Sequence, residues 1–97
     1  MKIEINDTKD NPVNLLRQAG YIYQRNEGME MSFVRPLARQ GYPRFHMYAS
    51  LIGGQLIINI HLDQKKNTYG DNARHHGEYE KEGPLKIEAE RIKGIIG

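Results

Sequence analysis

The sequence contains no cysteine, which excludes disulfide bonds and metal sites built from thiolates. It also has no apolar run near the length of about 20 residues that crosses a bilayer. The opening segment, MKIEINDTKD, lacks the apolar core of a signal peptide, and no internal repeat is visible. We therefore expect a cytoplasmic protein with no membrane segment.

A large excess of charge of either sign is absent as well. The chain carries 14 Lys and Arg against 12 Asp and Glu, a formal net charge of +2. This balance is compatible with a nucleic-acid partner but does not indicate one. With 97 residues, of which 38% are hydrophobic and 27% charged, the chain fits one globular domain over residues 1–97.

The clearest pattern that is present lies in RFHMYASLIGGQLIINIHLD, from Arg44 to Asp63. Apolar and polar residues alternate strictly on both sides of Gly53 and Gly54, which predicts two half-buried strands joined by a tight turn. If the two glycines form the turn, all the apolar side chains lie on one face. The polar face then carries three cross-strand pairs: Arg44 with Asp63, His46 with His61, and Tyr48 with Asn59.

Two segments have the features of helices. Asn11 and Pro12 suit the N-cap and first position of a short helix, which Gly20 ends. Residues 83–84, Gly-Pro, open a C-terminal helix. Its apolar stripe consists of Leu85, Ala89, Ile92 and Ile96.

The remaining segments predict a second hairpin and two loops. Residues 21–25 and 29–35 form its strands, joined by a three-residue loop that pairs Tyr23 with Met31 and Tyr21 with Phe33. Residues 36–43, PLARQGYP, predict a loop. Residues 64–83 predict a long polar loop that is either functional or mobile, and residues 1–10 predict either a short strand or a tail.

Together these segments predict a two-layer α+β domain. Its sheet is a four-stranded antiparallel meander, with the short N-terminal helix and the C-terminal helix on one face. The other face is left open to solvent or to a partner. We expect the core to contain Leu16, Phe33, Phe45, Met47, Ile58, Ile60, Leu62 and Ile92.

Two resemblances add to this prediction. The runs HLDQKK (61–66), HGEYE (76–80) and EAERI (88–92) resemble a family of short uncharacterised proteins from uncultivated small-genome bacteria of the candidate phyla, which implies no activity. The run LLRQAGYIYQRNEG (15–28) resembles the opening of HicA-type toxins, small RNA-cleaving proteins with a double-stranded-RNA-binding-like α-β-β-β-α fold. That family has a histidine after the glycine of its first hairpin, whereas Gly28 is followed here by Met29. The resemblance therefore implies the helix-glycine-strand architecture rather than cleavage.

The open face suggests a metal site. His46, His61 and Asp63 would offer two imidazoles and one carboxylate, a ligand set for zinc or iron. The alternative is a polar surface whose histidines only pack against each other. The loop from His75 to Glu78 could add His76 as a further ligand or supply a general base, or it could be a solvated segment.

The first function that we expect is a small module that binds RNA or another polyanion on the open face. The alternative is a metal-dependent or histidine-based hydrolase or nuclease that uses His46, His61, Asp63 and the loop from His75 to Glu78. The sequence does not decide whether the protein is an enzyme, and it implies no cofactor other than that divalent metal. Arg44 would be either an ion-pair partner of Asp63 or a ligand for an anion, and the ion pair is favoured because Asp63 would compete with the anion. The residues expected to bind the ligand are Arg39, Arg44, His46, Tyr48, Asn59, His61, Asp63, Lys65 and Lys66.

Overall fold

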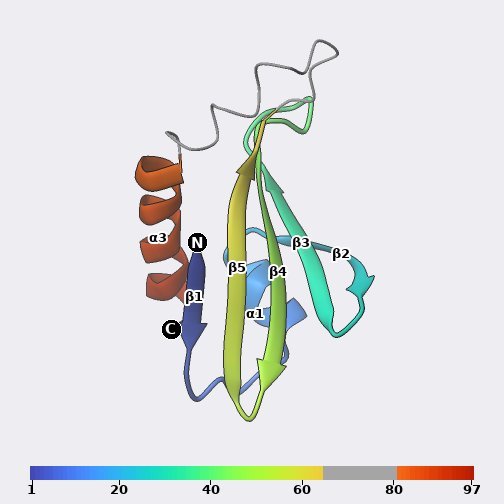
Figure 1. Cartoon of the computed structure of the whole chain (residues 1–97), viewed down its shortest axis with the longest axis vertical. Helices are drawn as coiled ribbons and strands as arrows, with labels where there is room; N and C mark the ends of the chain where they lie inside the picture. Colours follow the sequence, from blue (N-terminus) through green and yellow to red (C-terminus); the bar gives the residue numbers. More distant parts are fainter. Residues whose placement is uncertain (65–80) are drawn as a thin grey trace.

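The computed structural model describes residues 1–64 and 81–97, with side chains described for residues 1–64 and 83–97. The fold is α+β, with α1 and α3 packed on one face of a five-stranded antiparallel sheet of order β1-β5-β4-β3-β2 (Figure 1). None of the described helices is long and apolar enough to cross a membrane. The elements are β1 (Lys2–Ile5), α1 (Pro12–Gln18), β2 (Ile22–Glu27), β3 (Glu30–Pro36), β4 (Arg44–Ile52), β5 (Gln55–Asp63), a π-helical turn (Lys81–Leu85) and α3 (Lys86–Ile96).

The predicted β4–β5 hairpin and its register are confirmed. Gly53 and Gly54 form the turn with φ angles of 57° and 81°, which glycine adopts without steric cost. The strands pair Arg44 with Asp63, His46 with His61 and Tyr48 with Asn59. The turn and the alternation agree, so the polar set and the apolar set lie on opposite faces.

The sheet has five strands rather than the four predicted. Residues 2–5 form β1, which pairs antiparallel with β5 and places Ile3 opposite Ile58 and Ile5 opposite Leu56. Both isoleucines of β1 are buried, at 2% and 6% exposure. Their alternation with polar residues therefore marks a strand rather than a tail, because its apolar face completes the core.

The β2–β3 hairpin forms, but the predicted register is wrong. The chain turns through Gly28 and Met29, with Glu27 opposite Glu30, and Tyr23 pairs with Phe33 instead of Met31. The pairing shifts between Tyr23 and Arg25, which leaves Gln24 as an extra residue in β2. The two-residue turn and this bulge together replace the predicted three-residue loop.

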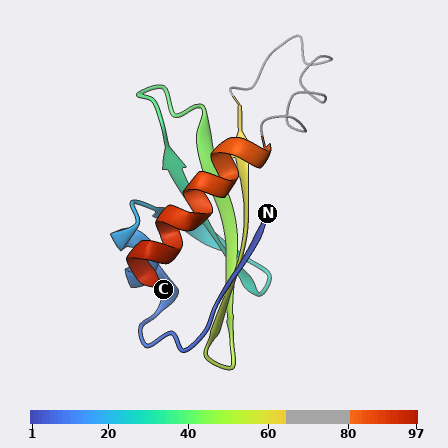
Figure 2. The ribbon, with the colours of Figure 1, turned by 90° about the vertical axis from the view of Figure 1, so that its left-hand side faces the viewer.

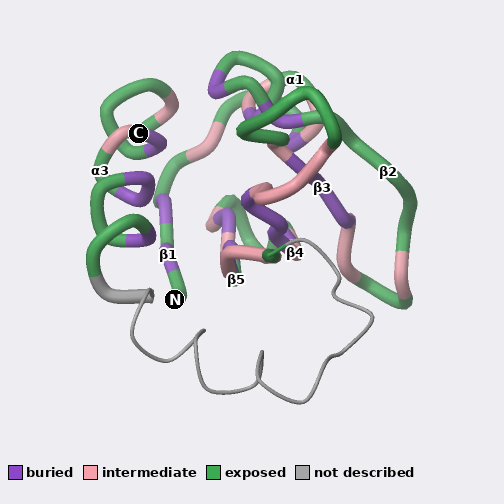
Figure 3. Tube along the Cα trace, turned by 90° about the horizontal axis from the view of Figure 1, so that it is seen from above, coloured by how far each residue is buried: buried purple, intermediate pink, exposed green. Residues whose placement is uncertain are grey.

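The core lies between the sheet and the two helices, where the buried segments face one another (Figure 3). Of the predicted core residues, only Leu62 is partly buried, and it packs against the cluster from its edge. Tyr21 and Leu85 are also fully buried members that the prediction did not include. Helix α1 begins as predicted, because the Asn11 side chain accepts a hydrogen bond from the Asn14 backbone N–H at 2.9 Å.

Helix α3 runs across the face of the sheet (Figure 2) and is attached there by a buried carboxylate. Glu88 is 4% exposed and accepts a hydrogen bond from the Tyr21 hydroxyl at 2.7 Å. The Arg91 guanidinium donates to both Glu88 oxygens at 2.9 Å and to the Ala19 carbonyl. Arg35 lies 3.5 Å from the same carboxylate. This network joins α3 to the end of α1 and to the sheet.

Candidate metal-binding site

The candidate site lies on the face of the sheet opposite the helices, toward the end where β4 begins and β5 ends. Alternation along the two strands puts Arg44, His46 and Tyr48 of β4 beside His61 and Asp63 of β5. Asn59 lies opposite Tyr48 but is exposed, and no described contact joins it to the cluster. Arg39 is exposed in the loop between β3 and β4. The remaining predicted ligands, Lys65, Lys66, His76 and the loop from His75 to Glu78, lie outside the described residues.

Asp63 is the centre of the cluster. Its Oδ2 atom is 3.3 Å from Nδ1 of His46, and its Oδ1 atom is 3.2 Å from Nε2 of His61. Oδ2 also accepts a hydrogen bond from Nε of Arg44 at 3.3 Å. The carboxylate therefore contacts both imidazoles, one with each oxygen.

The spacing of these atoms suits a small divalent ion. One donor atom from each of His46, His61 and Asp63 falls in a group whose members all lie within 4.8 Å of one another. Zinc bonds to nitrogen and oxygen of about 2.0–2.2 Å, at tetrahedral angles, place neighbouring ligand atoms about 3.4 Å apart. The nitrogen–oxygen distances of 3.3 and 3.2 Å are close to this value, but each involves a different oxygen of Asp63. Binding of an ion would draw the three ligand atoms together from their present spread of up to 4.8 Å.

The aromatic rings of the site pack against one another. The centroids of His46 and His61 are 4.9 Å apart, with the ring planes at 61°, and Tyr48 lies 4.8 Å from His46. As a result His46 is only 8% exposed, and its neighbours Ser32 and Val34 on the same face are also buried. The prediction of an open face is therefore wrong at this point, because side chains of the sheet itself exclude solvent.

Burial lowers the pKa of His46 below its ordinary value of 6.5. The charges of His61 and Arg44 lower it further, while the Asp63 carboxylate opposes the shift. The imidazole of His46 is therefore neutral at neutral pH. A neutral imidazole is the form that binds a metal ion.

Sequence reasoning missed two residues near His46: Ser32, which contacts the imidazole, and Gln24, which contacts Ser32. The Ser32 Oγ atom is 2.9 Å from Nε2 of His46, and the Ser32 hydroxyl donates to Oε1 of Gln24 at 2.9 Å. Ser32 pairs with Tyr48 across β3 and β4. Alternation could place Ser32 on one face of β3, but the loop between β3 and β4 is too long to fix their register. The bulge at Gln24 also has no sequence signal.

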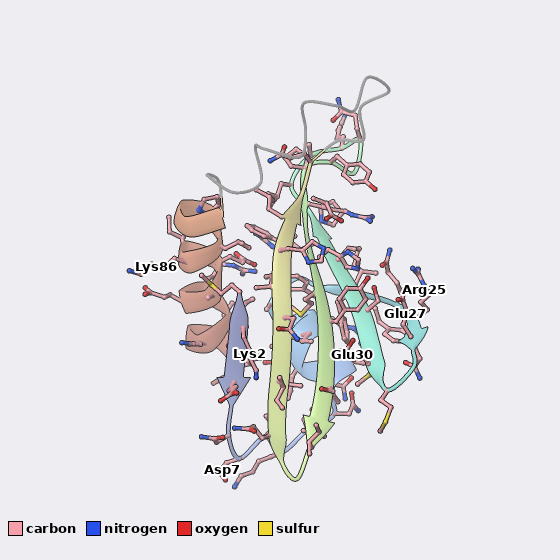
Figure 4. The ribbon with its side chains drawn as sticks, viewed as in Figure 1. Lys2, Asp7, Arg25, Glu27, Glu30 and Lys86 are labelled. Carbon is pink, nitrogen blue, oxygen red and sulfur yellow. The ribbon has the colours of Figure 1, made fainter. Side chains whose placement is uncertain are left out.

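Arg44 takes the role of ion-pair partner. Besides its contact with Asp63, its guanidinium carbon lies 4.6 Å from the centre of the Tyr42 ring. Lys2 and Arg25 lie on the two edge strands of the sheet, β1 and β2 (Figure 4). Nζ of Lys2 lies 3.4 Å from a carboxylate oxygen of Glu4, and a guanidinium nitrogen of Arg25 lies 2.6 Å from a carboxylate oxygen of Glu27. Within the described residues, these cations of the sheet are therefore paired with carboxylates.

No protein-family model, curated protein or solved structure matches this chain. Any function must therefore be inferred from the geometry and chemistry of the site.

Proposed function

We propose that the protein binds a divalent transition-metal ion, with zinc as the best fit, through His46, His61 and Asp63. One observation carries the proposal: three donor groups of the right chemistry converge within 4.8 Å on two neighbouring strands. Two imidazoles and a carboxylate suit zinc or iron(II) better than magnesium or calcium, which prefer oxygen ligands. The β4–β5 ladder holds the ligands on a rigid element.

A site of three protein ligands also favours hydrolysis as its chemistry. A zinc ion held by His46, His61 and Asp63 would leave a position for water and would lower the pKa of that water toward neutrality. Arg44 lies beside the carboxylate at 3.3 Å and would place a positive charge next to the reacting centre. That charge suits an anionic substrate such as a phosphoester. The proposal is thus a metal-dependent hydrolase.

Binding of RNA or another polyanion is the second candidate. It is supported by the ring cluster of His46, Tyr48 and His61 and by Arg44 stacked on Tyr42, since bases and phosphates bind to such groups. The pairing of Lys2 and Arg25 with carboxylates favours the metal site instead.

Titration of the metal-free protein with zinc, and with cobalt(II) as a coloured substitute, tests the proposal. The parent should bind one ion and give the absorption of tetrahedral cobalt. His61→Ala and Asp63→Asn should abolish binding, because each removes one of three ligands, whereas Asn59→Ala, a neighbour on the same face, should bind as the parent does. Failure of the parent to bind either ion contradicts the proposal. Salt-dependent binding of an RNA pool that survives in His61→Ala and Asp63→Asn would favour the polyanion module.

A further inference from the structure

We infer that Ser32 and Gln24 are positioning residues of the metal site. They hold His46 in the tautomer that carries its proton on Nε2, so that the lone pair of Nδ1 is directed at Asp63 and serves as the metal ligand. The choice of ligand atom rests on the proposed function. The tautomer itself is a property of the metal-free protein.

The hydrogen bonds determine where the proton lies. The Ser32 hydroxyl has a single proton, and it donates this proton to Oε1 of Gln24 at 2.9 Å. The Oγ atom of Ser32 is also 2.9 Å from Nε2 of His46. Because its proton is already donated to Gln24, Oγ can only accept a hydrogen bond from the histidine. Ser32 has 0% exposure, which leaves no solvent to replace either contact. With the hydroxyl proton given to Gln24, a neutral His46 carries its proton on Nε2.

This arrangement leaves two electron-rich atoms facing each other. With the proton on Nε2, Nδ1 presents its lone pair to Oδ2 of Asp63 at 3.3 Å. A metal ion held between them would stabilise both. A second proton, on Nδ1 of the imidazolium, would do the same, because it donates a hydrogen bond to Asp63. The protein thus prepares Nδ1, rather than Nε2, for the ion. Partners that hold the far nitrogen of a ligand histidine orient its ring in the same way.

The bulge in β2 brings Gln24 into this chain of contacts. The pairing of β2 with β3 shifts between Tyr23 and Arg25, and Arg25 rather than Gln24 lies opposite Ser32. A bulge redirects the side chain of its extra residue, and here the Gln24 amide reaches the Ser32 hydroxyl. The irregularity that sequence reasoning missed therefore contributes to the site.

Nitrogen-15 NMR of the His46 ring in metal-free protein at pH 8 tests the tautomer directly. The parent should show the proton on Nε2. Ser32→Ala removes the oxygen that accepts from Nε2 of His46. Gln24→Met, at an exposed position, removes the carbonyl that orients the Ser32 hydroxyl. In both variants the proton should shift toward Nδ1, where it can donate to Asp63. Gln24→Glu keeps an acceptor and should retain the parent tautomer, and Ser50→Ala provides a matched serine control on the same face.

Zinc titration of the same variants gives the second measurement. Ser32→Ala and Gln24→Met should weaken zinc binding about 10–100-fold, the usual effect of losing a group that orients a ligand, and Ser50→Ala should match the parent. The inference is overturned if His46 of the parent protein carries its proton on Nδ1. It is also overturned if Ser32→Ala and Gln24→Met both keep the tautomer of the parent, or if both keep its zinc affinity. A parent with the Nε2 tautomer that binds no zinc overturns the proposed function and the assignment of the ligand atom, and leaves the positioning of the tautomer supported.

Discussion

Neighbouring residues of β5 have opposite tasks because of the strand pleat. Ile60 is 1% exposed and packs in the core beneath the helices, whereas His61 lies on the other face beside Asp63. The same holds on β4 for Met47, which is fully buried in the core, and His46. A substitution on the core face can therefore alter stability without removing a group of the site. A substitution on the opposite face can remove a group of the site without opening a cavity in the core.

Ile60→Ala tests this division. Loss of the buried side chain and the resulting cavity should lower the free energy of unfolding by about 2–5 kcal/mol. Ile87→Ala is a matched control, because Ile87 is 72% exposed on α3 and the same truncation should have little effect there. Urea unfolding measures both variants. A loss below about 1 kcal/mol for Ile60→Ala would show that the assigned facing of β5 is wrong.

Among the residues of the site, the sequence predicts those whose positions depend on one short turn. His46, His61 and Asp63 follow from Gly53 and Gly54, since the two glycines set the register of the whole hairpin. Ser32 and Gln24 do not follow in this way. Their positions depend on a β3–β4 register that spans a loop, and on a bulge with no turn residue to mark it.

Among the elements, α3 depends on a single buried charge for its attachment. Burial raises the pKa of Glu88, but hydrogen bonds from Arg91 and Tyr21 and the charge of Arg35 outweigh it, and the net pKa is lowered. The carboxylate is therefore ionised at neutral pH and balances the two arginines. Burial, together with the hydrogen bond to Glu88, raises the pKa of Tyr21, so its hydroxyl stays protonated as a donor.

Replacing this carboxylate should loosen α3. Glu88→Gln keeps the shape but removes the charge that Arg91 and Arg35 face, and hydrogen bonds to charged groups contribute about 1.5–3 kcal/mol each. Because both arginines are about one-third exposed, we expect a net loss of about 1–3 kcal/mol in urea unfolding. Glu90→Gln, on the exposed side of the same helix, should change stability by less than about 0.5 kcal/mol. Equal losses in the two variants would argue against the anchoring role.

The sequence predicts the existence of most elements better than their pairing. The cap at Asn11, the presence of a C-terminal helix and both hairpins follow from local signals. The predicted start of that helix is wrong, because Pro84 lies inside the π-helical turn and α3 begins at Lys86. The role of β1 depends on β5, more than 50 residues away in the chain, as its pairing of Ile3 with Ile58 shows. Non-local pairing of this kind has no turn to announce it.

For the molecule as a whole, the shifted pKa values of His46 and Glu88 predict how stability depends on pH. The pKa of His46 is lower in the folded state than in the unfolded chain, so the unfolded chain binds more protons below pH 6.5. The free energy of unfolding of the metal-free protein should therefore fall as the pH drops below 6.5. This fall should end once the pH is below the pKa of His46 in the folded protein. The lowered pKa of Glu88 adds a second loss, which begins near 4.5 and continues as the pH falls through the folded value.

Urea unfolding at a series of pH values, with a chelator present, would resolve the two stages. His46→Gln should flatten the first stage and leave the second, and Glu88→Gln should do the opposite. A parent whose stability is constant from pH 7 to pH 5 would contradict the assigned burial of His46.

The bulge at Gln24 also bears on how the protein behaves at high concentration. In the described part of the chain, β2 is the last strand of the sheet, and its outer N–H and C=O groups form a free edge. A regular edge is a template on which a strand of another molecule can add and begin an aggregate. The extra residue breaks the repeat of these groups halfway along β2 and twists the strand. The irregularity that directs Gln24 toward Ser32 thus also makes the edge a poor start for a fibril.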